Sequence, residues 1–158
     1  ITPVQMLRAV AAIVNGGKLV TPHFGLYTSS SDGSVVNEFA YSTEEEAISL
    51  QTSEMMKQIL EGVVSEGGGT KAYIEGYSIG GKTATSQKLP RGSGKYISSF
   101  IGFAPAENPQ VIAMCLIDEP TGVYYGGTIA APVVKTLYEN ILPYLGIERS
   151  VKLEKNSD

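Results

Sequence analysis

Three stretches in the second half of the chain constrain the fold more than any other feature. Residues 77–87, 96–104 and 110–118 read as extended segments, and only residues 88–95 and 105–109 connect them. Connections of this length are too short for a helical crossover between parallel strands, so we expect an antiparallel meander. The third stretch is apolar at every position from 111 to 117, which is typical of a strand covered on both faces. Helices are therefore expected on both sides of the sheet.

Helical periodicity supplies candidates for those helices. Thr2 and Pro3 fit the N-cap and first-turn proline of a helix that ends at residues 15–17, Asn-Gly-Gly. A second helix is predicted from residue 52 or 53 to about 65, and a third over residues 126–145. The sequence thus predicts the α+β class, with an antiparallel sheet flanked by helices.

Shorter sequence patterns predict a hairpin and a short helix between the first two long helices. Extended runs at 18–27 and 34–39 flank a Ser- and Gly-containing turn at 29–33, which predicts a hairpin. Thr43 and Glu46 have the spacing of a capping box and predict the start of a short acidic helix. The acidic residues there are interpreted as a solvated face rather than a metal site.

Composition excludes several classes of function. The chain has 158 residues, about one domain, and its 42% hydrophobic and 18% charged content indicates a globular protein. A net charge of −4 argues against nucleic acid as the main partner. Cys115 and His23 are the single residues of their types, which disfavours a transition-metal site, and no cofactor is predicted.

The two ends of the chain suggest its context. The chain starts at Ile1 without a methionine, and we expect it to be a piece of a longer protein. No apolar run reaches the roughly 18 residues of a transmembrane helix. Residues 148–158 are predicted to form a charged, disordered tail.

The stretch 76–87, GYSIGGKTATSQ, gathers small, hydroxyl and basic residues at a chemically useful spacing. Strand alternation places Lys82 and Ala84 on one side and Thr83 and Thr85 on the other, after glycines that let a ligand come close. An ammonium, hydroxyls and a strand-edge N–H together suit a carboxylate or an oxyanion. The simpler alternative is a solvated Lys-Thr pair on an edge strand.

The same stretch matches a nucleotide-binding pattern. Gly76 to Thr83 satisfies G-x-x-x-x-G-K-[ST], and Asp118 and Glu119 follow an apolar strand as in P-loop enzymes. A P-loop needs a helix to begin at its Lys-Thr, whereas the chain soon reaches Leu-Pro-Arg-Gly-Ser-Gly at 89–94. The parallel crossover is also missing, so the sequence argues against nucleotide binding.

A family resemblance covers nearly the whole chain. Residues 82–85, K-T-A-T, look like the K-T-G-T element of penicillin-binding proteins. Four further stretches, ITPVQMLRAVAAIVNGGKLVTPHF, LEGVVSEGGGTKA, YISSFIGFAPAENPQVIAMCLIDEP and YYGGTIAAPVV, resemble the C-terminal half of the transpeptidase domain of class B penicillin-binding proteins. This group includes division and sporulation enzymes. The resemblance spans residues 1–147 and implies a serine β-lactamase/transpeptidase-like fold that lacks its N-terminal part.

The resemblance implies a D,D-transpeptidase that cross-links peptidoglycan stem peptides ending in D-Ala-D-Ala. Proteins of this family act on the outer side of the cytoplasmic membrane, to which an N-terminal anchor holds them. In such enzymes a serine is acylated by the stem peptide or by a β-lactam. By resemblance, Lys82 supplies positive charge and assists proton movement, and the Thr83 hydroxyl binds the terminal carboxylate. The Thr85 N–H forms half of the oxyanion hole, and Gly81 and Ala84 complete the substrate-binding set.

Two departures from the family pattern matter. The sequence contains neither Ser-x-x-Lys nor Ser-x-Asn, so the isolated chain is expected to be inactive. Ala84 also replaces the usual glycine, which puts a methyl group on the side of Lys82, where the family packs the nucleophile helix. A non-catalytic alternative remains open, in which apolar surface left by the missing half of the domain drives self-association.

Overall fold

The computed structural model describes residues 1–44 and 46–149. The chain forms two compact units, Ile1–Ser53 and Glu54–Asp158. Their boundary falls inside the helix α2 (Leu50–Ser65), so no linker marks it in the sequence. The tail predicted at 148–158 lies outside the described residues from position 150 onward.

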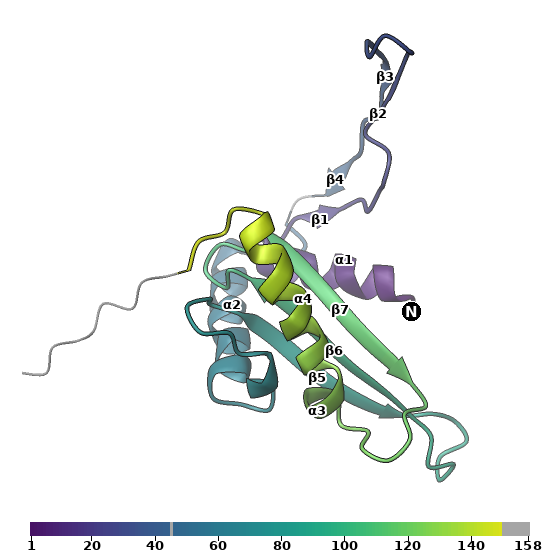
Figure 1. Ribbon diagram of the computed structural model, residues 1–158, viewed down its shortest axis with the longest axis vertical. Coiled ribbons are helices and arrows are strands. Elements are labelled where there is room, and N and C mark those ends of the chain that lie inside the picture. The colour runs from purple at the N-terminus through teal and green to yellow at the C-terminus, as the bar shows by residue number, and fades with distance from the viewer. Residues whose placement is uncertain (45, 150–158) are drawn as a thin grey trace, which may run out of the picture. The chain divides into compact units, whose positions relative to one another are not determined.

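The second unit is built on an antiparallel sheet of three strands (Figure 1). The strands are β5 (Gly80–Gln87), β6 (Tyr96–Ala104) and β7 (Val111–Asp118), in the order β5-β6-β7. The register aligns Lys82 with Ile101, and Ile101 with Met114. Each strand pairs with its neighbour in sequence, which confirms the predicted meander.

One face of this sheet carries the core of the unit. Phe100 of β6 is fully buried there in one cluster with Val134 and Tyr138 of α4 (Ala131–Tyr144). The Tyr138 hydroxyl donates a hydrogen bond to the Gly102 carbonyl at 2.5 Å. Burial raises the pKa of Tyr138, so the phenol stays neutral. The middle strand is thereby tied to α4, which crosses the sheet in Figure 1.

The last predicted helix is interrupted. Instead of one helix over residues 126–145, a short helix α3 (Gly126–Ile129) precedes α4, with Ala130 between them. Pro132 explains the break, since it lies in the first turn of α4 and has no N–H to continue the ladder of the preceding turn. A 3₁₀ turn, η1 (Thr70–Ala72), lies between α2 and the sheet in sequence.

The strand β7 is less covered than its apolar sequence predicts. It is an edge of the described sheet, none of its residues is fully buried, and Leu116 is 44% exposed. The alternate residues pack against the core, namely Val111, Ala113, Cys115 and Ile117. The expectation of full cover on both faces is wrong for this strand, because alternation sends every second side chain to the opposite face.

The first unit contains a capped helix and two small strand pairs. The helix α1 (Pro3–Val14) begins at a capping box in which Thr2 and Gln5 exchange hydrogen bonds. The strand pairs are β1 (Leu19–Val20) with β4 (Thr43–Glu44), and β2 (Tyr27–Ser29) with β3 (Val35–Glu38). The predicted first helix and hairpin are confirmed.

The capping box predicted at Thr43 and Glu46 is wrong. Thr43 lies in β4 opposite Val20, and Glu46 has a left-handed backbone with a φ of 63°. Pairing gives Thr43 an extended backbone, which leaves no helical turn for its hydroxyl to cap. The next helix, α2, starts later in the chain, where the Ser49 hydroxyl accepts a hydrogen bond from the Thr52 N–H at 3.1 Å.

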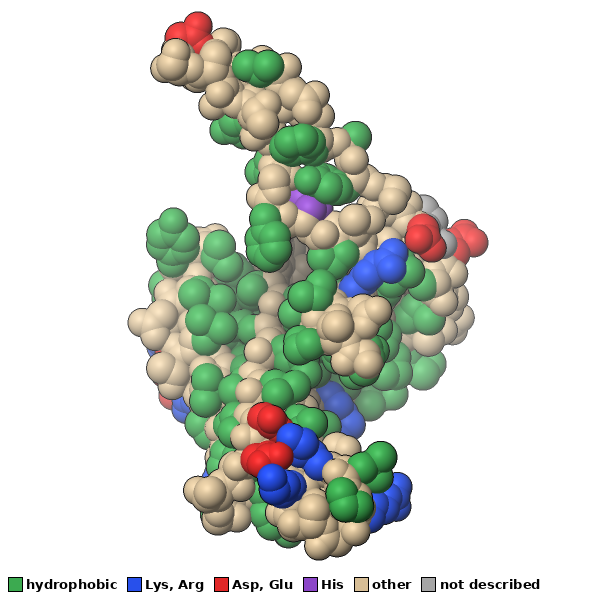
Figure 2. Space-filling model, turned by 90° about the vertical axis from the view of Figure 1, so that its right-hand side faces the viewer, with side chains coloured by type: hydrophobic (Ala, Val, Ile, Leu, Met, Phe, Trp, Pro, Cys, Tyr) green, Lys and Arg blue, Asp and Glu red, His purple; other side chains and the backbone are tan. Residues whose placement is uncertain are grey.

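The β2–β3 hairpin exposes every one of its residues. Figure 2 shows hydrophobic side chains along the arm that contains it. They include Phe24, Leu26, Tyr27, Val35 and Val36. In its turn, the Asp32 carboxylate accepts hydrogen bonds from Ser30 and Ser34, which hold the pKa of that carboxyl well below its usual range. Backbone pairing and this turn, rather than a core, keep the hairpin ordered.

Candidate functional site

The K-T-A-T segment lies in the middle of β5, an edge strand. Among the described residues β5 pairs only with β6, so its other edge faces outward. Thr83 and Thr85 lie on the face that meets α3, and alternation puts Lys82 and Ala84 on the opposite face. Thr83 is half-buried and the other three are exposed. The predicted residues thus occupy one accessible stretch of strand edge.

The Lys82 ammonium folds back along its own strand. Its Nζ donates a hydrogen bond to the Thr83 carbonyl at 2.6 Å. An ammonium has three donors, so this contact leaves capacity for a ligand oxygen nearby. Lys82 therefore places positive charge beside the Thr83 position on the strand edge.

Thr85 is fixed by the helix that follows the sheet. The Gly126 N–H donates to the Thr85 hydroxyl oxygen at 3.0 Å. A Cβ on Gly126 would lie 2.3 Å from the carbonyl oxygens of Ala84 and Ser99, so only glycine allows this approach. Because the Thr85 oxygen accepts here, its own proton remains free to donate to an anion.

Gly81, a predicted substrate-binding residue, is buried. A Cβ there would lie 2.5 Å from Cζ of Phe100. At the neighbouring Gly80 a Cβ would lie 2.2 Å from Cζ of Phe103. Each glycine lets an aromatic ring of β6 lie against the β5 backbone, and alternation along the strands puts the Phe100 and Phe103 rings on opposite faces of the sheet.

Sequence reasoning missed an aromatic cluster beside Thr85. Tyr96 and Tyr124 stack with ring centroids 4.1 Å apart, and Tyr125 lies 4.7 Å from Tyr124. Ser98, aligned with Thr85 across the strands, donates a hydrogen bond to the Tyr124 carbonyl. A hydrogen bond with Tyr124 raises the pKa of Tyr125. The sequence Tyr-Tyr-Gly-Gly at residues 124–127, after the last strand, was the signal that could have indicated this cluster.

Several other kinds of site find no support in the part of the chain that the structure describes. No group of three or more His, Cys, Asp or Glu residues there could hold a metal ion. No described helix is both long and apolar enough to cross a membrane. The P-loop reading is wrong, because Lys82 and Thr83 continue β5 to Gln87 and start no helix. Cys115 is half-buried, and burial raises the pKa of its thiol.

Comparison with known families gives one assignment. Residues 1–139 match the family described as "Penicillin binding protein transpeptidase domain". The chain is 40% identical over 161 residues to stage V sporulation protein D of Bacillus subtilis. This alignment covers 98% of the present chain and 25% of the relative. It is 32% identical over 158 residues to a probable peptidoglycan D,D-transpeptidase PenA of Neisseria flavescens, covering 97% of this chain and 37% of the relative. The chain therefore spans a quarter to about two fifths of these relatives.

Solved structures of transpeptidase domains and penicillin-binding proteins have the same fold as this chain. Penicillin-binding protein 3 of Mycobacterium tuberculosis, in complex with ampicillin, superposes with a TM-score of 0.82 at 28% identity over 98% of this chain and 37% of that chain. The D,D-transpeptidase domain of a peptidoglycan glycosyltransferase from Eggerthella lenta gives a TM-score of 0.77 at 28% identity, over 91% of this chain and 32% of that chain. The predicted α+β, transpeptidase-like fold is thus confirmed.

Proposed function

The chain belongs to the family of penicillin-binding protein transpeptidase domains, and we propose that residues 1–147 form the C-terminal part of such a domain in a peptidoglycan D,D-transpeptidase. The relatives named as D,D-transpeptidases support this reaction class. The whole protein then acts on stem peptides ending in D-Ala-D-Ala, at the outer face of the cell membrane. Its division or sporulation setting follows the relatives, which include a sporulation protein and FtsI of Buchnera aphidicola.

The observation that carries the proposal is the accessible edge of β5. In the proposed mechanism a serine from the rest of the domain attacks the carbonyl of the penultimate D-Ala, and the terminal D-Ala leaves. The acyl group then passes to an amine of a second stem. Thr83 binds the substrate carboxylate, Lys82 provides the nearby positive charge and helps move a proton, and the Thr85 N–H stabilises the oxyanion.

The geometry around β5 supports these roles. The Gly126 N–H occupies the Thr85 hydroxyl oxygen, which leaves the hydroxyl proton to donate to an anion, and the Phe100 and Phe103 rings pack against Gly81 and Gly80 on opposite faces of β5. Such a preorganised edge lowers the cost of placing donors around developing negative charge. Ala84, exposed on the face of Lys82, would meet the nucleophile-bearing part of the domain.

We further propose that the chain alone binds but does not turn over substrate, because its sequence offers no Ser-x-x-Lys nucleophile. The same β5 edge would take the carboxylate of a β-lactam. The solved relative from Mycobacterium tuberculosis was crystallised with ampicillin and with aztreonam, which supports this choice of probe.

The test combines two readouts on the isolated chain. Benzylpenicillin titrated into ¹⁵N-labelled chain should shift the amide signals of Thr83 and Thr85, while intact mass spectrometry should show no covalent adduct. Thr83→Val, which keeps the shape of the side chain, should weaken binding about tenfold. The matched control Thr136→Val, on the exposed surface of α4, should leave it unchanged. Shifts confined to residues away from β5 would contradict the proposal.

A further inference from the structure

Gly127 brings three segments of the second unit together. It is the second residue of α3. A Cβ on it would lie 2.2 Å from the Gly68 carbonyl oxygen and 3.1 Å from Cγ2 of Thr83. Only a residue without a side chain lets the glycine turn at 67–69, the strand β5 and α3 meet this closely. The Thr83 methyl group therefore lies against the Gly127 backbone.

The glycine turn at 67–69 is held against the end of α2. The Gly69 N–H donates a hydrogen bond to the Val63 carbonyl at 2.9 Å. A Cβ on Gly69 would lie 3.0 Å from that same carbonyl oxygen, so the turn packs closely on the helix. The Gly68 carbonyl thus has a fixed position opposite Gly127.

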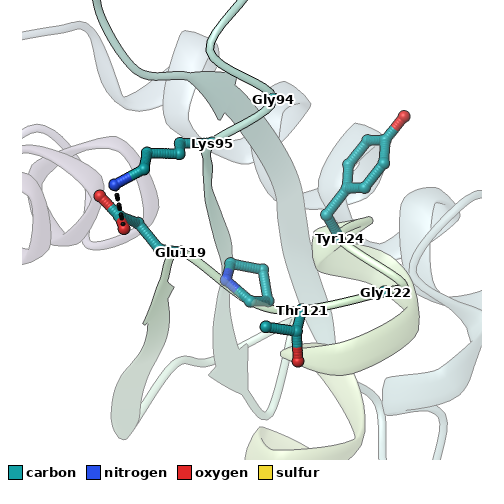
Figure 3. Close-up of a pocket in the computed structure, with 7 residues that line it drawn as sticks. Gly94, Lys95, Glu119, Thr121, Gly122 and Tyr124 are labelled. Carbon is teal, nitrogen blue, oxygen red and sulfur yellow. Dashed lines mark hydrogen bonds and ion pairs between the residues drawn. The ribbon is translucent and has the colours of Figure 1, made fainter.

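The loop that leads from β7 to α3 is held at both ends (Figure 3). At its start Glu119 pairs with Lys95 at 2.9 Å, which is the dashed contact in Figure 3. At its end the Tyr124 ring stacks on the Tyr96 ring, with centroids 4.1 Å apart. The first turn of α3 is thus held in place by this loop, as the glycine turn is by α2.

The Thr83 side chain is constrained at its methyl group and free at its hydroxyl. Among residues 1–44 and 46–149, no group forms a hydrogen bond with this hydroxyl. Threonine has three staggered positions around χ1, and placing Cγ2 against Gly127 selects one of them, which also fixes the direction of the hydroxyl. A hydroxyl spread evenly over three rotamers would weaken a contact that needs one of them about threefold.

We propose that Gly127 is a positioning residue that holds the Thr83 methyl group against α3 and so aims the Thr83 hydroxyl at the carboxylate of the substrate or of a β-lactam. Gly127 itself touches no ligand and acts through Thr83. The inference rests on the proposed function and adds to it the residue that orients the carboxylate donor.

The first measurement needs no ligand. In the ¹³C,¹⁵N-labelled chain the Thr83 methyl protons should show a nuclear Overhauser effect to the Gly127 α protons, and the χ1 couplings of Thr83 should report one rotamer. In Gly127→Ala the new methyl group would meet the Gly68 carbonyl oxygen at 2.2 Å, so the contact must open and the couplings should average. Gly62→Ala, where a Cβ meets nothing within 4 Å, is the matched control and should keep the single rotamer.

The second measurement is the affinity of each variant for benzylpenicillin. Thr83→Ser keeps the hydroxyl but has no methyl group to hold it, so it should bind about threefold more weakly. Gly127→Ala should weaken binding by about threefold or more. Added to Thr83→Val, which has no hydroxyl to orient, Gly127→Ala should change the affinity by less than about twofold. A merely structural effect of Gly127→Ala would instead cost the same in both backgrounds.

The outcomes separate the inference from the proposed function. Averaged couplings of Thr83 in the unsubstituted chain, or a single rotamer that survives Gly127→Ala, would overturn the inference. So would an unchanged affinity in Thr83→Ser, a result that does not depend on whether Gly127→Ala folds, or an equal loss from Gly127→Ala with and without the Thr83 hydroxyl. All of these leave the proposed function standing. No binding of benzylpenicillin at β5 of the unsubstituted chain would contradict the proposed function, and the inference with it.

Discussion

The β5–β6–β7 sheet and the β2–β3 hairpin are both antiparallel, yet they are stabilised in opposite ways. The sheet has α4 on one face and fully buried residues such as Phe100 and Tyr138. The hairpin exposes all of its residues, including apolar ones such as Val36. A two-stranded hairpin without a core is marginally stable in water. The K-T-A-T edge therefore belongs to a sheet with a packed core, and we call this sheet together with α4 the platform. The hairpin, in contrast, depends on its turn and on its backbone hydrogen bonds.

The largest expected effect comes from removing the centre of the platform. Phe100→Ala should lower the free energy of unfolding by about 3–5 kcal/mol, because the ring is fully buried and its loss leaves a cavity. Val36→Ala in the hairpin should change it by less than about 0.5 kcal/mol. Urea unfolding followed by circular dichroism measures both. Equal losses would show that the two regions share one source of stability.

A substitution at Gly126 should damage the link between β5 and α3. In Gly126→Ala the new methyl group would lie 2.3 Å from the Ala84 carbonyl oxygen, so the helix must shift and the Thr85 contact is lost. We expect a loss of about 1–3 kcal/mol in unfolding free energy, with a changed Thr85 amide signal. Gly62→Ala, where a Cβ meets nothing within 4 Å, is the matched control and should stabilise α2 slightly.

Alkaline pH should weaken the platform through Tyr138. Burial raises the pKa of Tyr138 in the folded state, so its stabilising contribution is complete below the unfolded pKa of about 10 and is lost as pH rises above it. Unfolding midpoints should therefore fall between about pH 9 and 11. Tyr138→Phe should reduce that slope, at the cost of the hydrogen bond to the Gly102 carbonyl. A slope that is unchanged in the variant would contradict this assignment.

The smallest effect is expected in the hairpin at acid pH. Hydrogen bonds from Ser30 and Ser34 lower the pKa of Asp32, so their contribution is present above the unfolded pKa of about 4 and is lost as pH falls below it. NMR signals of β2 and β3 should move towards unfolded values on acidification, while those of β6 stay in place. Asp32→Asn should make the hairpin insensitive to this change.

The sequence predicted the parts of the fold that local signals determine. The short connections between strands predicted the meander. Thr2 and Pro3 predicted the first helix, and the Ser-rich turn predicted the hairpin. The resemblance to class B penicillin-binding proteins is likewise confirmed by the family match and by the relatives. The first three features depend on residues that lie close together in sequence, and the resemblance depends on the order of motifs along nearly the whole chain.

The errors arose where tertiary pairing decides the structure. Thr43 has the right spacing for a cap, but pairing with Val20 makes its backbone extended. The aromatic cluster escaped notice because Tyr96 and Tyr124 meet only once β6 and the loop before α3 have folded together. The Lys82 contact with the Thr83 carbonyl likewise depends on a side-chain rotamer that no sequence pattern fixes.

Self-association remains a prediction for the isolated chain. The exposed apolar residues of the hairpin arm offer a surface for it, and Figure 2 shows them on one view of the molecule. Sedimentation velocity should show dimers or larger species that increase with concentration. A strictly monomeric profile at high concentration would count against the interaction role.

We propose that β5 forms the carboxylate-binding edge of a transpeptidase and that residues outside this chain supply its nucleophile. The most direct measurement is labelling by a fluorescent penicillin, applied to the isolated chain and to the product of the complete gene, with and without Thr83→Val. We predict that the complete protein is labelled, that Thr83→Val slows its labelling about tenfold or more, and that the isolated chain is not labelled. Stable labelling of the isolated chain, or labelling of the complete protein at an unchanged rate in Thr83→Val, would contradict the claim.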